Sequence, residues 1–106
     1  MKLGIILETS ELEKSWNALR FANTSLNRGH EVKVFLMGEA VECIEIRSGK
    51  FDIQAELSKF SAASGIMMAC GTCLKSRQHD GTETCPTSTM IDCVELVEWA
   101  DKVLTF

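Results

Sequence analysis

The amino-terminal part of the chain alternates continuous apolar runs with apolar residues at helical spacing. Residues 2 to 8, KLGIILE, form an apolar run that is typical of a strand buried on both faces. Apolar residues then recur at helical spacing up to Gly29, which is expected to end the helix, and Ser10 with Glu13 fits a capping box at its start. The run EVKVFLM at residues 31 to 37 predicts a second strand, parallel to the first because a whole helix connects the two.

The same alternation continues through the middle of the chain. Residues 38 to 50 fit either a short helix or a short strand, and the pattern does not decide between them. Asp52 is a suitable N-cap for a helix that Gly65 would end. The apolar run from Gly65 to Cys70 predicts a third strand, and residues 71 to 77 lose that character, which indicates a turn that opens a short helix.

The carboxyl-terminal part of the chain predicts one more helix and one more strand. Residues 78 to 84 are polar and indicate a surface loop, after which Pro86 marks the start of a helix. The apolar positions of that helix are Met90, Ile91, Val94, Val97 and Trp99. Its acidic residues are expected on a solvated face, and residues 102 to 106 are typical of a last strand. The whole pattern predicts an α/β layer fold with a mostly parallel sheet of four or five strands.

The chain length and the net charge limit the classes of function that this protein can have. The 106 residues suit a single domain, residues 1 to 106, and 45% hydrophobic residues are enough for a packed core. A formal net charge of -4 lacks the basic excess that nucleic-acid binding requires. The apolar runs are far too short to span a bilayer, and the amino terminus lacks the pattern of a signal peptide. We therefore expect a cytoplasmic protein with no nucleic-acid or membrane partner.

Five cysteines are the strongest functional lead in the sequence. An odd number cannot pair completely within one chain, and the reducing cytosol keeps thiols free, so these cysteines indicate thiol or metal chemistry. Cys43 and Cys93 lie among Val and Ile residues and are expected to be packing residues. Cys70 and Cys73 differ, because this Cys-x-x-Cys pair opens the turn after the predicted third strand.

The expected position of Cys70 favours a reactive thiolate. Sites in parallel sheets collect beyond the carboxyl ends of strands, and the start of a following helix stabilises negative charge on sulfur. This matters because a thiol with an ordinary pKa of about 8.5 is only about 3% ionised at pH 7. Lys75 and Arg77 would add positive charge, and Gly71 would leave the approach to the sulfur free of a side chain.

Three uses of these cysteines fit their spacing. As a redox pair in a dithiol oxidoreductase, Cys70 and Cys73 would cycle between dithiol and disulfide. In a zinc-binding structural module, His79 and Cys85 would join them in a tetrahedral ligand set. In a sulfur carrier, the Cys70 thiolate would take the outer sulfur of a donor persulfide and hold it as Cys-S-SH. The spacing alone leaves the three alternatives open.

Three segments of the chain resemble one known family. They are ACGTCLKSR after the third apolar run, the Cys-Pro-x-Ser-Thr-Met segment from Cys85 to Met90, and the closing WADKVLTF. With the opening KLGIILET and the chain length, they are similar to the DsrE/DsrF-like family, which comprises small sulfur-relay proteins related to TusD and YchN. The resemblance runs over nearly the whole chain.

The resemblance implies a fold, an assembly and a reaction. The fold is a three-layer α/β fold with helices on both faces of the sheet, and the assembly is a homo-trimer or homo-hexamer that works with sulfur donor and acceptor proteins. The reaction is transfer of sulfane sulfur through a cysteine at the start of the helix after the middle strand, which corresponds to Cys70. The basic residue of the family corresponds to Arg77, which is expected to help the thiolate or the incoming partner.

This chain departs from the resemblance in its extra cysteines, because relay members often have a single cysteine at this place. Cys73 is expected to be a resolving or assisting thiol, and Cys85 a third participant in the sulfur chemistry. No cofactor is expected, since Gly4 and Gly38 belong to no glycine-rich phosphate-binding pattern.

Overall fold

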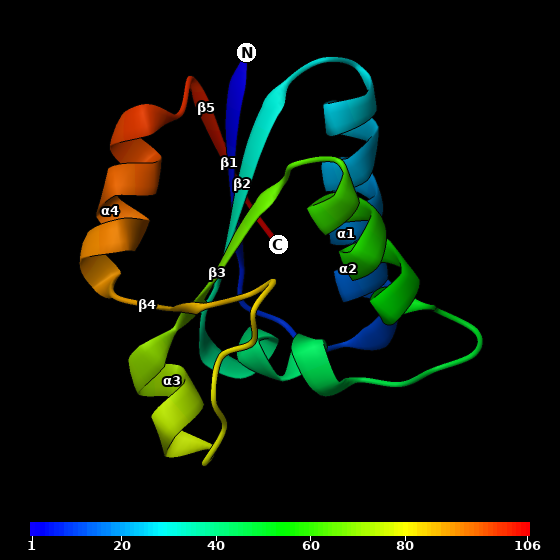
Figure 1. Ribbon diagram of the computed structural model, residues 1–106, viewed down its shortest axis with the longest axis vertical. Coiled ribbons are helices and arrows are strands. Elements are labelled where there is room, and N and C mark those ends of the chain that lie inside the picture. Colours follow the sequence, from blue (N-terminus) through cyan, green and yellow to red (C-terminus); the bar gives the residue numbers. More distant parts are fainter.

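The computed structural model describes all 106 residues and shows a three-layer α/β fold. In chain order the elements are β1 (Lys2–Leu7), α1 (Leu12–Asn27), β2 (Glu31–Leu36), the 3-10 helix η1 (Gly38–Glu45), α2 (Ile53–Ala62), β3 (Ile66–Cys70), α3 (Gly71–Ser76), β4 (Thr87–Ser88), α4 (Met90–Trp99) and β5 (Lys102–Thr105). Helices α1 and α2 cover one face of the sheet and α4 covers the other (Figure 1). The predicted fold class is confirmed.

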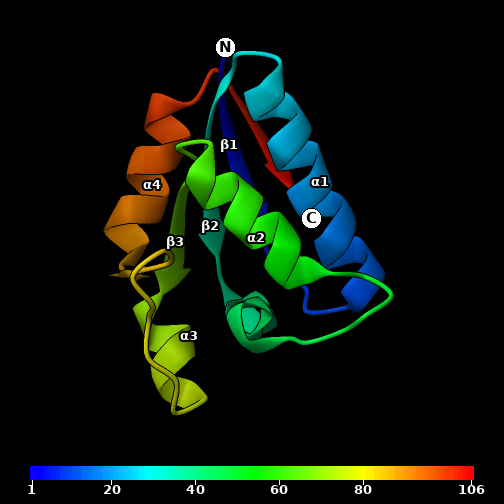
Figure 2. The same ribbon diagram turned by 45° about the vertical axis from the view of Figure 1, so that its right-hand side comes forward.

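All five strands of the sheet run parallel, in the order β4-β3-β2-β1-β5. Strand β1 pairs with β2 from Lys2 opposite Glu31 to Leu7 opposite Leu36, and with β5 on its other side. Because the strands are parallel, their carboxyl ends lie along one edge of the sheet. Helix α3 and the loop after it lie at this edge (Figure 2).

The short strand β4 differs from the prediction for this segment. The sequence indicates a helix start at Pro86, but Thr87 and Ser88 instead pair with Ala69 and Cys70 of β3. Helix α4 begins only at Met90, after a capping box in which the Asp92 carboxylate accepts a hydrogen bond from the Thr89 amide at 2.9 Å. A two-residue strand is too short to show a pattern of its own.

The N-caps of helices α1 and α2 agree only in part with the prediction. Asp52 caps α2, since its carboxylate accepts a hydrogen bond from the Ala55 amide at 3.0 Å. The N-cap of α1 is Glu11 and not Ser10, because the longer carboxylate reaches the amides of Glu13 and Lys14. These hydrogen bonds hold the pKa of Glu11 below its ordinary value.

Helix α4 covers its face of the sheet with few residues and leaves an apolar side exposed. Its buried residues are Cys93 and Leu96, which lie one helical turn apart and face the sheet. Most of the apolar positions expected in this helix are exposed instead; they are Met90, Ile91, Val94 and Val97. No helix of the chain combines the length and the apolar character that crossing a membrane would require.

Gly65, between α2 and β3, allows a close approach that a side chain would prevent. A β-carbon at this position would lie 2.5 Å from the ring of Phe60, which is buried in the core. We expect Gly65→Ala to lower the free energy of unfolding by about 1 to 3 kcal/mol, because an overpacked core must shift. Urea denaturation measures the loss. Gly49→Ala is the matched control, since a β-carbon there meets nothing within 4 Å, and equal stability of the two variants would contradict this account.

Candidate functional site

A cleft of about 540 Å³ opens at the carboxyl ends of β3 and β4. Its walls come from α3, β4, the start of α4 and part of the loop after α3. Cys70 is the last residue of β3 and the N-cap of α3, as the sequence predicts. Its side chain is only 5% exposed, so it is more enclosed than a freely accessible thiol, and it borders the cleft together with Cys73.

The start of α3 stabilises negative charge on the Cys70 sulfur less than the sequence suggests. The Cys70 side chain makes no capping hydrogen bond with the amides of α3, and this helix has only six residues. The helix dipole of such a short segment is small, since it grows with the number of aligned peptide units. The polar side chains that border the cleft are a second source of stabilisation for this sulfur.

Cys73 lies one turn into α3 and is anchored to a neighbouring element. Its sulfur accepts a hydrogen bond from the Gly38 amide, at the start of η1, at 3.2 Å. Burial raises the pKa of Cys73, and a side-chain hydrogen bond with Cys70 raises it further, while the Gly38 amide and the Arg77 charge act in the opposite direction. Cys73 is therefore a thiol that keeps its proton next to Cys70.

Arg77 lies beside Cys73 and not in the cleft. Its guanidinium donates to the Cys73 carbonyl at 3.2 Å, and its Nε lies 3.5 Å from Oε1 of Glu42 on η1. The cation that borders the cleft is Lys75, and His79 borders it too, with its Nδ1 3.2 Å from Oε1 of Glu45. Arg77 does not border the cleft, but its charge lowers the pKa of Cys73, which does.

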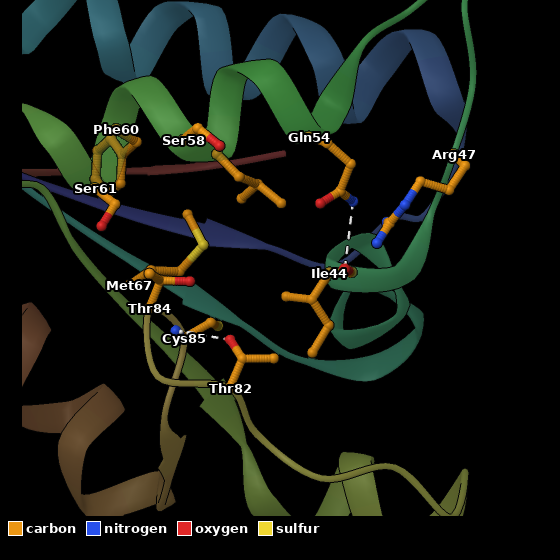
Figure 3. A pocket seen from close by; sticks show the side chains of 11 residues that line it. Ile44, Arg47, Gln54, Ser58, Phe60, Ser61, Met67, Thr82, Thr84 and Cys85 are labelled. Atoms are coloured by element: carbon orange, nitrogen blue, oxygen red, sulfur yellow. Dashed lines mark hydrogen bonds between the residues drawn. The ribbon is translucent and has the colours of Figure 1, made fainter.

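Cys85 lies in a second cavity, of about 270 Å³, under helix α2 (Figure 3). In this cavity Cys85 lies with Met67, Phe60 and Ser61, residues of β3 and α2. Its side chain is 2% exposed, and burial raises its pKa to about 12. The structure therefore does not bring Cys85 together with Cys70, although the sequence suggests that it takes part in the same chemistry.

The alternation of side chains along a strand explains this separation. Met67 and Cys70 are three positions apart on β3, so they point to opposite faces of the sheet. Cys85 accompanies Met67 on the α2 face, whereas Cys70 faces α4. The zinc set of Cys70, Cys73, His79 and Cys85 is consequently not assembled, and no group of three metal-ligating side chains lies close enough to hold an ion.

The remaining cysteines are packed in the core, as the sequence predicts. Cys43 is fully buried, and its thiol lies 3.5 Å from the Ser15 hydroxyl. Cys93 lies on the buried side of α4, on the same side of the sheet as Cys70. Burial raises the pKa of both thiols. Neither borders the cleft.

Comparison with known proteins assigns the chain to a family. The DsrE/DsrF-like family matches residues 1–106, the whole chain. The chain belongs to the DsrE/DsrF-like family. An uncharacterized protein of Methanocaldococcus jannaschii is 32% identical with full coverage of both chains, and one of Methanopyrus kandleri is 34% identical over 89% of this chain and 83% of the relative. The crystal structure of the ychN protein from E. coli is similar with a TM-score of 0.83 and 25% identity, covering 100% of both chains.

Gly71 has a different role in this DsrE/DsrF-like chain from the expected one. A β-carbon at Gly71 would lie 2.9 Å from Cγ2 of Thr87 and 3.2 Å from the Ser88 carbonyl oxygen. The glycine therefore lets β4 pack against the start of α3, and the space that it leaves is filled by β4. This contact brings Ser88, which sequence reasoning missed, to the wall of the cleft. The Cys-Pro-x-Ser-Thr-Met segment contains Ser88, but a strand of two residues leaves no pattern in it that indicates pairing with β3.

The buried Cys85 thiol predicts a pH dependence of stability. Its pKa is about 12 in the folded chain against an ordinary value of 9.0, so the folded chain holds this proton more tightly than the unfolded chain. The resulting stabilisation is complete below pH 9 and is lost as the pH rises towards 12. In this window Cys85 should lower the free energy of unfolding by up to about 1.4 kcal/mol per pH unit.

Urea denaturation at a series of pH values measures this dependence. Cys85→Ala removes the titrating group, so its stability should fall less steeply above pH 9 than that of the wild type. Parallel pH profiles for the two proteins would contradict the assignment.

Proposed function

We propose that this chain is a sulfur carrier in which Cys70 accepts sulfane sulfur from a donor persulfide and passes it to an acceptor thiol. The observation that carries the proposal is the position of Cys70 at the carboxyl end of β3, bordering a cleft in a chain of the DsrE/DsrF-like family. Loops and helix starts beyond the carboxyl ends of parallel strands are the usual place for a site in such a sheet.

The proposed transfer is a thiol exchange in which no net oxidation occurs. The Cys70 thiolate attacks the outer sulfur of the donor, R-S-SH, and an S–S bond forms while the S–S bond of the donor breaks. The donor leaves as its thiolate, R-S⁻, and Cys70 becomes Cys-S-SH, so charge and protons balance. An acceptor thiolate then removes the outer sulfur by the same exchange, which regenerates the Cys70 thiolate.

Cys73 fits the role of an assisting thiol in this reaction. Its raised pKa keeps it protonated, so it can donate a hydrogen bond to the Cys70 sulfur and does not compete as a nucleophile. Arg77 acts through Cys73, whose carbonyl it binds, and is a positioning residue for α3. Lys75 supplies positive charge at the border of the cleft.

The contact between the Cys70 and Cys73 thiols also favours a second candidate function, that of a dithiol oxidoreductase. A two-electron oxidant such as a disulfide would convert the pair to an intramolecular disulfide and be reduced to two thiols. The two candidates differ in the mass of the product, because a persulfide adds one sulfur and a disulfide removes two hydrogens.

The cellular setting that we propose is the cytoplasm, with sulfur donor and acceptor proteins as partners. A reducing compartment keeps cysteines as free thiols, which sulfur transfer through Cys70 requires. A donor or acceptor protein would present its own cysteine to the cleft, whose border carries both a cation, Lys75, and an acid, Asp80.

We further propose that the chain forms homo-oligomers through the exposed apolar side of α4. Ile91 is 70% exposed and Val94 is 54% exposed, and apolar side chains of this size gathered on one helix are typical of an interaction surface. Met90 belongs both to this surface and to the border of the Cys70 cleft. A second copy bound to α4 would therefore lie beside the cleft.

The sulfur-carrier proposal is tested by intact-mass measurement after incubation with a low-molecular-weight persulfide. The wild type should gain about 32 Da, one sulfur atom, whereas Cys70→Ser should gain nothing. Cys85→Ala is the matched control and should gain as much as the wild type, because Cys85 lies in the other cavity. An equal gain in Cys70→Ser would contradict the proposal, and a loss of about 2 Da without any gain would favour the oxidoreductase.

The assembly is tested by size-exclusion chromatography with light scattering. The wild type should have a mass that is a multiple of 11.7 kDa, and Ile91→Glu should shift it to the monomer, because a charge would be buried in the interface. Leu12→Glu is the matched control, since Leu12 is an exposed apolar residue on another helix, α1. A monomeric wild type, or an oligomer that Ile91→Glu leaves intact, would rule out this interface.

A further inference from the structure

Ser88 has a side-chain hydroxyl that no other group of the chain uses. Two other buried serines donate to main-chain carbonyls, Ser15 to Thr9 at 3.0 Å and Ser25 to Phe21 at 2.9 Å. The remaining two buried polar residues are joined by a hydrogen bond from Asn23 Nδ2 to Glu56 Oε2, while Asn23 Oδ1 is buried without a partner. Ser88 is only 9% exposed, and its hydroxyl takes part in none of the hydrogen bonds of the fold. The hydroxyl is not among the fully enclosed atoms that lack a partner, so it opens to the cleft that Ser88 borders and is free to form a hydrogen bond there.

Ser88 lies next to Cys70 in the sheet. Ser88 is paired with Cys70 in the parallel register of β4 and β3. Residues paired in this way point to the same face of a sheet, and neighbouring strands lie about 4.8 Å apart, so the two side chains are within reach of each other. Both residues border the same cleft.

We propose that the Ser88 hydroxyl is the hydrogen-bond donor that stabilises the thiolate of Cys70 and, in the sulfur-carrier reaction, the terminal sulfur of its persulfide. The persulfide part of this inference rests on the proposed function, whereas the thiolate part does not. A thiolate in an enclosed site needs hydrogen bonds to replace those of water. The α3 amides make no such bond to the Cys70 side chain, and Ser88 offers a hydroxyl from the neighbouring strand in addition to the Cys73 thiol of α3.

A serine hydroxyl suits both states of the sulfur. The O–H rotates freely about its C–O bond, so it can follow the negative charge from the Cys70 sulfur to the outer sulfur of the persulfide without a change of the main chain. The hydroxyl also stays uncharged over the range in which thiols titrate.

Several titratable groups around Cys70 also influence its charge. They are Cys73 and Lys75 of α3, His79 and Asp80 of the following loop, and Cys93 of α4. Of these, His79 is paired with Glu45 of η1. Substitutions of Ser88 leave all of these groups in place, so a displaced Cys70 titration in such a variant reports on the hydroxyl.

The test is the pH dependence of Cys70 alkylation by iodoacetamide, read at the Cys70 peptide by mass spectrometry. Ser88→Ala should move the midpoint of the alkylation profile up by about one pH unit, which corresponds to about tenfold slower alkylation at neutral pH. Ser61→Ala, which removes an exposed hydroxyl on α2, is the control and should leave the profile unchanged.

A second pair of variants keeps the test valid if Ser88→Ala folds poorly. Ser88→Thr and Ser88→Val have the same branched shape, and only the first keeps a hydroxyl. Ser88→Thr should retain the wild-type midpoint, whereas Ser88→Val should show the upward shift. Equal midpoints for these two variants, or no shift in a folded Ser88→Ala, would overturn the inference.

The alkylation assay contains no sulfur donor, so its result is independent of the sulfur-carrier proposal. Failure of the wild type to gain sulfur at Cys70 would refute the proposed function and leave an observed Ser88 shift standing. Conversely, a Ser88→Val variant with an unchanged Cys70 midpoint that still gains sulfur would refute the role of Ser88 alone.

Discussion

The pairing of β4 with the last two residues of β3 is the contact on which the whole site depends. It places Ser88 next to Cys70 on the α4 face of the sheet. The chain before β4, with Cys85, lies against α2 on the other face. Gly71 makes the pairing possible, since any side chain there would meet Thr87 and the Ser88 carbonyl. Two hydrogen-bonded residues thus decide which thiols share a cleft and which are kept apart.

Burial then assigns different roles to the five cysteines. Burial raises the pKa of Cys43, Cys73, Cys85 and Cys93, which disfavours their thiolate forms. Cys70 is itself only 5% exposed, so its reactivity depends on the cleft that it borders and on polar neighbours that stabilise negative charge. Cys70 has the cleft, and Ser88 is an uncommitted hydroxyl at its side. The family to which the chain belongs is consistent with sulfur relay in general, and these contacts indicate how this chain would carry it out.

Sequence patterns predicted the parts of this structure that repeat along the chain. The continuous apolar runs, the helical spacing and Asp52 as a cap were sufficient for the parallel sheet and for Cys70 at a strand end. The two-residue strand β4 could not be predicted, because it depends on a neighbour distant in the sequence and not on its own residues. For the same reason the separation of Cys85 from Cys70 was missed. The exposed side of α4 shows that an apolar pattern does not reveal which face a helix turns to its own sheet.

The most direct test of the account is to locate the transferred sulfur on the wild-type protein. After incubation with a persulfide donor, the thiols and persulfides are alkylated, the chain is digested, and the peptides are sequenced by tandem mass spectrometry. The account predicts a single additional sulfur on Cys70, the residue that ends β3, and no additional sulfur on the other four cysteines. Sulfur found mainly on Cys73 or Cys85, with Cys70 unmodified, would contradict it.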